Sequence, residues 1–401
     1  MSSAYIVDIL RTPIGKFGGS LAPVRPDDLA CLVIKKILER NKAVDPRLIE
    51  DVVFGAANQS GEDNRNVARM AALLAGLPVE VGGVTVNRLC ASGLQAIMDA
   101  ARGVMLEQGG IYIAGGVESM SRAPFVMPKS EEAFSRKTEI YDTTLGWRFV
   151  NSKLSALYHP YSMGETAENV ADKWKISREE QDEFAFHSSQ KYFNAAGAGK
   201  FADEIVSVPL AALKSEINQF EKDEHPRVTT LEKLATLKPA FKTNGSVTAG
   251  NSSGINDGAA AAIVVSEDLL KELSLKPLVR IVSMAIAGVD PAYMGIGPVP
   301  ATRKALSRAG LGIGDIGLVE VNEAFASQSI ACIRDLGLNP DIVNVNGGAI
   351  ALGHPLGCSG VRISATLIHE MKKRNVKYGL ATMCIGVGQG AAVVYENVTT
   401  S

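Results

Sequence analysis

Short apolar runs alternate with a helical pattern through the first 120 residues, and this alternation most constrains the fold. The runs at residues 52–54, 84–86 and 111–114 have the length and composition of buried strands. Between the first two, apolar side chains at helical spacing predict a helix over residues 65–74, which a glycine and a proline end. A strand, a helix and a strand in succession predict a sheet with helices on its faces. The fold class is therefore α/β.

The C-terminal third repeats this plan. Three further apolar runs correspond in order to the strands just described: residues 318–322, 342–346 and 378–383. The spacings differ by several residues, and identity between the two parts is low. The pattern nevertheless favours two similar α/β halves.

Residues 120–248 interrupt the alternation of strand-like and helical patterns, and we expect them to form an insertion between strands of the first half. Charged residues concentrate there, and Ser177 with Glu180 three positions later is typical of a helix N-terminus. The expected parts are an N-terminal half of residues 1–119 plus 249–271, a loop domain of residues 120–248, and a C-terminal half of residues 272–401.

Composition argues against several classes of protein. The chain has 401 residues, enough for two or three domains with ample cores. Its net charge of −2 and pI near 6.3 give no case for a nucleic acid or a membrane as partner, and no apolar run approaches the ~20 residues that span a bilayer. The strand-like run at residues 4–10 leaves no room for a leader peptide. Five widely spaced cysteines disfavour a disulfide framework, so we expect a reducing, cytoplasmic location.

Five glycines surround His354 between residues 346 and 360, and Pro355 follows it directly. Glycine is used where the backbone takes a positive φ or approaches another group closely, so a histidine in such a bend is more often presented to a ligand than buried. Cys90 and Cys384 lie in similar glycine-containing segments, each at a predicted junction of strand and loop. One histidine and two cysteines in these positions suggest thiol chemistry.

Each of these residues has an ordinary structural alternative. Cys90 without its motif would be a small buried side chain. Residues 91–98 look helical, however, which places the sulfur at the positive end of a helix dipole, where the pKa of a thiol can be lowered. His354 could be a hydrogen-bonded loop residue, or it could join Cys358 in a metal site, because the two have ligand-like spacing. The sequence has no CxxC pair to support a metal, and we expect none.

Several longer motifs accompany these three segments in a fixed order: Arg-Thr-Pro-Ile-Gly-Lys-Phe-Gly-Gly at 11–19, Gly-Gly-Val-Glu-Ser-Met-Ser at 115–121, Thr-Ala-Gly-Asn-Ser-Ser-Gly at 248–254 and Asn-Glu-Ala-Phe-Ala at 322–326. Together they make essentially the whole chain resemble the thiolases, enzymes that make or cleave 3-oxoacyl-CoA thioesters. The resemblance implies the thiolase fold: two similar βαβαβαββ halves of five strands each, stacked as α/β/α/β/α layers, with an inserted CoA-binding loop domain. It also implies that Cys90 and His354 occupy equivalent strand-to-helix junctions at the seam between the halves.

The resemblance implies a role for each reactive residue. Cys90 would take the acyl group as a thioester after His354 removes its proton, and Cys384 would give or take the proton at C2 of the acetyl unit. The N–H groups of Cys90 and Gly386 would form one oxyanion hole, and His354 with a water held by Asn322 would form the second. An ordinary turn residue is the alternative for Asn322.

The resemblance also implies that coenzyme A is a substrate and that no separate cofactor is needed. Ser253, with Ala249 and Gly254 beside it, matches the pantetheine site, and Arg227 matches an arginine near the adenine and phosphates. Lys233 replaces a family serine after a loop that is one residue shorter than in some relatives, so both charges could be ordinary surface residues. The expected substrate-binding set is completed by Met163, Ala324 and Phe325.

Ser162 stands where biosynthetic thiolases often have a histidine beside the acyl group, which argues for a substrate other than acetoacetyl-CoA. Residues 61–69 and 142–151 look especially like the 3-oxoadipyl-CoA thiolases of aromatic-compound degradation. Such a substrate ends in a carboxylate, and a carboxylate in an apolar tunnel needs a cationic or multi-donor partner. Arg148 is the candidate, and a salt bridge within the loop domain is its alternative.

The expected activity is that of an acetyl-CoA C-acyltransferase that cleaves a 3-oxoacyl-CoA, in particular 3-oxoadipyl-CoA, with CoA by a ping-pong mechanism. One alternative is the synthesis of acetoacetyl-CoA from two acetyl-CoA molecules. A ketoacyl synthase would need a second catalytic histidine, and a non-catalytic thiolase-like carrier of CoA or lipid would generally lack the nucleophile or the base. The family resemblance further implies a homodimer or a homotetramer.

Overall fold

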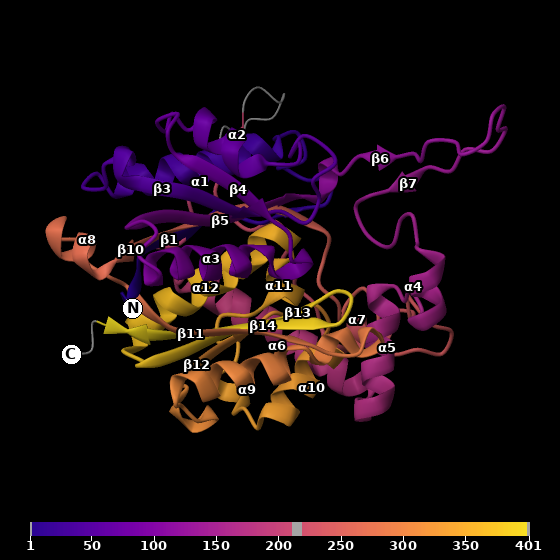
Figure 1. The fold of residues 1–401 in the computed structure, drawn as a ribbon. Helices are drawn as coiled ribbons and strands as arrows, with labels where there is room; N and C mark the ends of the chain where they lie inside the picture. Colours follow the sequence, from indigo (N-terminus) through magenta and orange to yellow (C-terminus); the bar gives the residue numbers. More distant parts are fainter. Residues whose placement is uncertain (1, 211–218, 399–401) are drawn as a thin grey trace.

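Two sheets alternate with three layers of helices (Figure 1), which is the layered α/β/α/β/α arrangement expected from the sequence. The computed structural model describes residues 2–210 and 219–398. The strands of both sheets belong to one hydrogen-bonded path, β12-β13-β14-β11-β1-β10-β5-β3-β4. The two parts of this path meet where β1 pairs with β11 through only two residue pairs, Tyr5 with Arg280 and Ile6 with Val279.

The upper sheet contains the strands expected in the first half. Its strands are β1 (Ala4–Arg11), β3 (Ile49–Gly55), β4 (Gly82–Val86), β5 (Ile111–Ser119) and β10 (Asn256–Ser266), with the short β2 (Gly15–Lys16) paired to β10. β3 is parallel to β4 and β5, whereas β10 is antiparallel to β5 and β1. The predicted strands at 52–54, 84–86 and 111–114 are confirmed, as is the helix between the first two, α2 (Val67–Leu74).

The lower sheet consists of β11 (Val279–Gly288), β12 (Leu318–Val321), β13 (Tyr378–Ile385) and β14 (Gln389–Asn397). The strand predicted at residues 342–346 is wrong. A 3₁₀ helix, Pro340–Ile342, stands there instead, and one isolated bridge between Val319 and Val343 takes the place of a fifth strand. Asn344 has a φ of 45°, which ends extended pairing, and its side chain bonds the N–H and C=O of Val321.

Helices cover the outer face of each sheet and fill the space between the sheets (Figure 1). α1 (Pro26–Arg40) lies with α2 on the outer face of the upper sheet, and α9 (Pro298–Ala309) lies with α10 (Ala326–Leu336) on the outer face of the lower sheet. Between the sheets run α3 (Ser92–Met105) and α12 (Leu356–Arg374). These two helices contribute to one large apolar cluster with both sheets, which explains why nearly all of their residues are buried.

The backbones of α3 and α12 approach each other through glycines. A Cβ on Gly93 would lie 2.6 Å from the carbonyl oxygen of Gly357, and a Cβ on Gly360 would lie 2.0 Å from the backbone nitrogen of Leu94. Any larger residue would therefore force the helices apart. The approach takes place at the N-terminal ends of both helices, next to the segments that carry Cys90 and His354.

The segment between β5 and β10 leaves the layered body and returns to it. Its elements are β6 (Phe125–Val126), β7 (Tyr141–Asp142), α4 (Ser152–Leu157), α5 (Met163–Trp174), α6 (Arg178–Gly197), β8 (Val208–Pro209), β9 (Gln219–Phe220) and α7 (Leu231–Ala235). The predicted N-terminus of α6 is confirmed, because Ser177 and Glu180 form a reciprocal capping box. The remaining helices are α8 (Glu267–Glu272) and α11 (Ala349–Leu352).

A fully buried arginine attaches this segment to the upper sheet. Arg11, at the end of β1, places its Nε 2.7 Å from Glu204 and its Nη1 2.7 Å from Asp223. Its guanidinium also lies over the ring of Phe201, 5.4 Å from the centroid. Both carboxylates come from the inserted segment, so this charged cluster fixes the segment to the first strand of the chain.

We predict that Gly360→Ala lowers the free energy of unfolding by about 1–3 kcal/mol, because the new methyl group must displace the backbone at Leu94. Urea unfolding followed by circular dichroism measures the change. Gly197→Ala, at the end of α6, is the matched control: no atom lies within 4 Å of a Cβ built there, so the change should be neutral or stabilise by up to about 1 kcal/mol. Equal stability of Gly360→Ala and the wild type would contradict this close helix contact.

Candidate active site

Cys90 lies in a one-turn 3₁₀ helix, Leu89–Ala91, between the end of β4 and the start of α3. The helix predicted after Cys90 is therefore confirmed. Leu89 has a φ of 46°, which turns the chain sharply and leaves the Cys90 side chain half-buried. The backbone N–H groups of Gly386 and of Cys90 itself donate to its sulfur.

The expectation that the helix N-terminus lowers the pKa of Cys90 is wrong for the free protein. Burial raises the pKa of this thiol to about 11, and hydrogen bonds from the backbone N–H groups of Gly386 and Cys90 offset only part of that effect. The desolvation of the thiolate outweighs the donors that face it. Cys90 is accordingly a thiol at neutral pH, and its activation requires a base.

His354 lies between α11 and α12, where its position and tautomer are fixed by hydrogen bonds. Its backbone N–H donates to Asn256 Oδ1 at 2.9 Å. Its Nδ1 lies 2.6 Å from Ser359 Oγ, and this hydroxyl donates its single proton to the carbonyl of Pro355 at 2.8 Å. Ser359 must therefore accept from Nδ1–H, so that Nε2 carries the lone pair of the neutral ring. Nε2 is the nitrogen that can act as a base.

Asn322 contacts the basic nitrogen of His354. It follows β12 directly, and its Nδ2 lies 3.3 Å from His354 Nε2. Its own backbone N–H is held by the carbonyl of Thr382 at 3.0 Å. Within the described residues, the buried Oδ1 of Asn322 has no hydrogen-bond partner. A buried oxygen without a partner is an acceptor available to a water or a substrate.

The surroundings of His354 keep its imidazole neutral. Burial lowers the pKa of His354 to about 3, and the positive charge of Arg362 on α12 contributes in the same direction. Arg362 is itself fully buried 3.5 Å from Glu320, whose pKa is raised by burial to about 8. Sequence motifs alone do not reveal Ser359, Glu320 or Arg362, because their roles depend on contacts between distant parts of the chain.

Cys384 approaches the same place from the lower sheet. It is buried in β13 opposite Gly390 of β14, and its pKa is raised well above the usual value by burial and then by the proximity of Cys90. The tight turn between the two strands places Val387 and Gly388 at positive φ, 64° and 81°. This turn carries the N–H of Gly386 to the sulfur of Cys90.

Cys90 opens into a cavity of about 400 Å³ with mostly apolar walls. Glu118 lines this cavity and accepts hydrogen bonds from three backbone N–H groups, those of Ala57, Asn58 and Gly357. Burial outweighs those donors and raises its pKa to about 7. The other lining residues include Met163, Ser162, Trp147 and Arg148. Met163 and Arg148 are therefore the members of the predicted substrate-binding set that lie in the cavity of Cys90.

A second group of predicted residues lies together on another side of the site. The N–H of Ser253 donates to the carbonyl of Ala324 at 3.0 Å, and Ser252 forms an isolated bridge with Phe325. Ala324 and Phe325 share one apolar cluster with Cys384 and Met163. Gly254 packs against the ring of His225, and Ala249 is exposed nearby in the sequence. This group connects the segment before β10 to the site.

The predicted cations of the CoA site lie in and just before α7. Burial, and then the charge of Arg227, lower the pKa of His225, whose ring packs against Gly254. Arg227 and Lys233 are both exposed, Arg227 in the loop before α7 and Lys233 within it. The carbonyl of Arg227 accepts a hydrogen bond from Ser189 Oγ at 3.0 Å. Within the described part of the chain, neither side chain forms an ion pair, so both are available to an anion.

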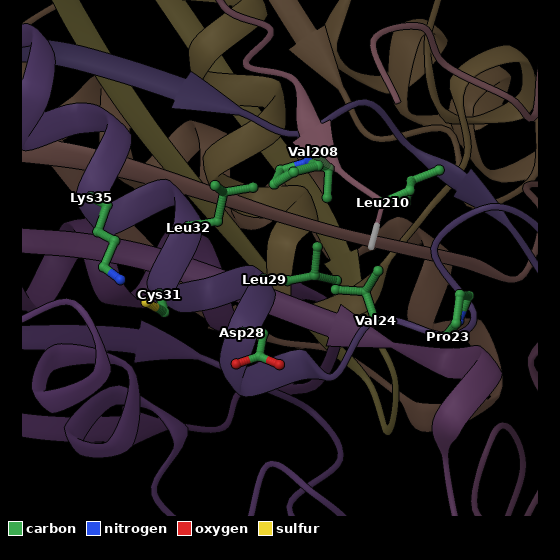
Figure 2. Close-up of a pocket in the computed structure, with 10 residues that line it drawn as sticks. Pro23, Val24, Asp28, Leu29, Cys31, Leu32, Lys35, Val208 and Leu210 are labelled. Atoms are coloured by element: carbon green, nitrogen blue, oxygen red, sulfur yellow. The ribbon is translucent and has the colours of Figure 1, made fainter. Parts of the chain in front are cut away.

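Another cavity, of about 320 Å³, lies away from these residues (Figure 2). Its walls come from α1, from the loop before it and from β8, and they include Leu29, Leu32 and Val208. Cys31 reaches this cavity, where burial raises its pKa and Lys35 opposes the effect. None of the residues assigned to thiol chemistry lines it.

The described residues contain no group of three or more histidines, cysteines and acids that could hold a metal ion. Cys358, the possible partner of His354 in such a site, is buried in the large apolar cluster. No helix in the described ranges is both long enough and apolar enough to cross a membrane.

We predict that alkylation of Cys90 by iodoacetamide rises about tenfold per pH unit from pH 7 to pH 10, because only the thiolate reacts and its pKa is about 11. Peptide mass spectrometry of the labelled protein measures the rate at this cysteine. The same measurement in urea is the control and should level off near about pH 8.5. A plateau near that pH in the folded protein would refute the raised pKa.

Comparison with known proteins identifies the family. Residues 4–268 match the family model "Thiolase, N-terminal domain", and residues 275–397 match "Thiolase, C-terminal domain". The chain is 56% identical over 401 residues to the 3-oxoadipyl-CoA/3-oxo-5,6-dehydrosuberyl-CoA thiolase of Escherichia coli K12, covering 99% of this chain and 100% of the relative.

Solved structures give the same result. The acetyl-CoA acetyltransferase of Bacillus anthracis superposes with a TM-score of 0.93 at 44% identity, covering 99% of both chains. Human mitochondrial 3-ketoacyl-CoA thiolase in complex with CoA superposes with a TM-score of 0.92 at 42% identity, covering 99% of this chain and 98% of that one. The chain belongs to the thiolase family and is an acyltransferase that uses CoA thioesters.

Proposed function

We propose that this thiolase cleaves 3-oxoadipyl-CoA with CoA to give acetyl-CoA and succinyl-CoA. The observation that carries the proposal is the arrangement at Cys90: a protonated thiol under the N–H of Gly386, close to Cys384, in a cavity whose lining includes a cation. The name and the 56% identity of the Escherichia coli relative support the choice of substrate.

The first half-reaction transfers the acyl group to Cys90. His354 Nε2 accepts the thiol proton, and the sulfur attacks C3 of the 3-oxoacyl-CoA. The N–H groups of Cys90 and Gly386 stabilise the resulting oxyanion. The bond between C2 and C3 then breaks, and its electron pair forms the enolate of acetyl-CoA. His354 and a water held by Asn322 stabilise that enolate oxygen.

Cys384 completes the first half-reaction by giving its proton to C2 of the enolate. Its raised pKa suits this role, because a thiol that stays protonated at rest is ready as a donor. Acetyl-CoA then leaves. The proton that His354 took from Cys90 then restores Cys384. In the second half-reaction a new CoA thiol gives its proton to His354 and attacks the acyl group on Cys90. Cys90 leaves as a thiolate, takes that proton back from His354, and the shortened acyl-CoA is released.

The substrate proposal gains support from Ser162. Its hydroxyl accepts a hydrogen bond from the N–H of Glu165 at 3.3 Å, and Glu165 in turn accepts from the N–H of Ser162 at 2.7 Å. This capping box begins α5 and engages the hydroxyl of Ser162. Biosynthetic thiolases often have a histidine at this position. The synthesis of acetoacetyl-CoA is therefore less favoured. A non-catalytic carrier is disfavoured as well, since nucleophile and base are both retained.

CoA binding is assigned in this proposal to residues 120–248 and to the segment that follows. Ser253, Ala249 and Gly254 contact the pantetheine arm, with Ala324 and Phe325 behind them. Arg227 and Lys233 are exposed charges suited to the phosphates. The N-terminal half comprises residues 1–119 plus 249–271, and the C-terminal half comprises residues 272–401.

A homodimer or homotetramer is also proposed. The arm around β6, β7 and α4 exposes large apolar side chains: Phe125, Phe134 and Leu157 are 73%, 98% and 76% exposed. Such a patch favours contact with another copy of the chain. A monomeric mass in light scattering at micromolar concentration would refute this oligomeric state.

A reducing, cytoplasmic location is proposed as well. All five cysteines are free, which supports it.

We predict that Cys90 and Cys384 act in different steps, which variants of each can distinguish. After exposure to acetyl-CoA, intact-protein mass spectrometry should find an added acetyl group in the wild type and in Cys384→Ser, and none in Cys90→Ala. Cys384→Ser should nevertheless lose cleavage of 3-oxoacyl-CoA, because C2 lacks its proton donor. Acetylation of Cys90→Ala would remove Cys90 as the nucleophile. Equal loss of both half-reactions in a folded Cys384→Ser would remove the separate role of Cys384.

The substrate proposal predicts kcat/KM at least about 10-fold higher for 3-oxoadipyl-CoA than for 3-oxohexanoyl-CoA, which has a methyl group in place of the carboxylate, since a charge-assisted hydrogen bond contributes at least this much. Acetoacetyl-CoA serves as the short-chain comparison. The assay follows loss of the Mg²⁺–enolate absorbance. A preference for the uncharged chain would overturn the proposed substrate.

A further inference from the structure

Arg148 is the cationic residue among those that line the cavity of Cys90. The lining holds one other ionisable side chain besides the cysteine, Glu118. That carboxyl group is already bonded to three backbone N–H groups and has a raised pKa, so it does not act as a fixed counter-charge for Arg148. The cavity therefore combines apolar walls, a nucleophile and one permanently charged guanidinium.

Arg148 is half-buried, and its guanidinium has no protein partner in residues 2–210 and 219–398. It forms neither an ion pair nor a side-chain hydrogen bond with any of these residues. The alternative stated from the sequence, a salt bridge within the loop domain, is therefore not present in the described structure. An arginine carries five N–H donors in a planar fork, and because no protein group occupies them here, they are available to an anion bound in the cavity.

The loop that carries Arg148 is held in place by its neighbours. Trp147 donates from Nε1 to the carbonyl of Tyr161 at 2.9 Å. Thr143 is buried, donates to the carbonyl of Pro124 at 2.6 Å and accepts from Asn58 Nδ2 at 2.9 Å. These bonds tie the loop both to the entry of α5 and to the wall of the cavity. The backbone that carries Arg148 is thus held in place before any ligand binds.

We propose that Arg148 binds the terminal carboxylate of the acyl group through two parallel hydrogen bonds and so selects dicarboxylic substrates. The inference rests on the proposed function, because it concerns the acyl group carried by Cys90. After cleavage of 3-oxoadipyl-CoA, that group is a succinyl thioester whose carboxylate carbon is the fourth carbon from the sulfur. The planar fork of arginine fits a carboxylate at the far end of so short a chain.

The anion at Arg148 could instead be a phosphate of CoA. The residues assigned to the pantetheine arm, Ser253 with Ala324 and Phe325, do not line this cavity. Arg227 and Lys233, the cations assigned to the phosphates, do not line it either. The cavity of Arg148 is therefore the acyl side of the site. The two sources of anion predict different kinetics, since only the carboxylate varies with the acyl group.

The test compares 3-oxoadipyl-CoA with 3-oxohexanoyl-CoA in the wild type, Arg148→Gln and Arg148→Lys. We expect Arg148→Gln to lower the ratio of the two kcat/KM values about 10-fold or more, because a charge-assisted bidentate contact is lost. The ratio for Arg148→Lys should lie between those of the wild type and Arg148→Gln, since lysine keeps the charge but lacks the planar fork. Lys153→Gln is the matched control: it removes an exposed cation on α4 that does not line the cavity, and the ratio should stay at its wild-type value.

Acetylation of Cys90 by acetyl-CoA in each variant verifies that the site is folded. Equal losses on both substrates in Arg148→Gln would assign the arginine to CoA and overturn the inference. If the wild type prefers 3-oxoadipyl-CoA and Arg148→Gln keeps both kcat/KM values, the role of Arg148 is overturned and the proposed substrate stands. A wild type that prefers 3-oxohexanoyl-CoA would overturn the proposed substrate, and the role of Arg148 with it.

Discussion

The crossing of α3 and α12 is the contact on which the rest of the site depends. Gly93 and Gly360 let the two backbones meet without intervening side chains, and the apolar cluster around them locks both helices between the sheets. Cys90 and His354 each lie at the N-terminal end of one of these helices. Their separation is therefore set by a direct contact between two helix backbones, which is how a rigid scaffold keeps reacting groups in register.

Burial also determines the charge state of the site. It raises the pKa of Cys90 to about 11, lowers that of His354 to about 3 and raises that of Glu118 to about 7. A thiolate–imidazolium pair is therefore disfavoured in the free protein. Donors stand ready at Cys90 for the negative charge that appears only during reaction, and such pre-arranged donors stabilise a transition state more than a ground state.

Much of this arrangement could be predicted from the chain, and the failures have physical causes. The strands of the first half, α2, the cap of α6 and the glycine-rich settings of Cys90 and His354 are local patterns, and they were predicted correctly. The prediction of a strand at 342–346 is wrong because Asn344 adopts a left-handed backbone conformation, and its side chain accepts a hydrogen bond from Val321 of the neighbouring strand. The pKa of Cys90 and the tautomer of His354 depend on burial and on Ser359, which appear only in three dimensions.

The position of β1 in the upper sheet has a consequence for synthesis of the protein. This strand leaves the ribosome well before its two neighbours, β10 and β11, which begin at Asn256 and Val279. Arg11 likewise lacks its ion-pair partners until Glu204 and Asp223 have been synthesised. An apolar central strand thus stays without partners while about two thirds of the chain is made. Unpaired strands of this kind can associate with other chains, so we expect the growing polypeptide to be prone to aggregation until β10 and β11 emerge.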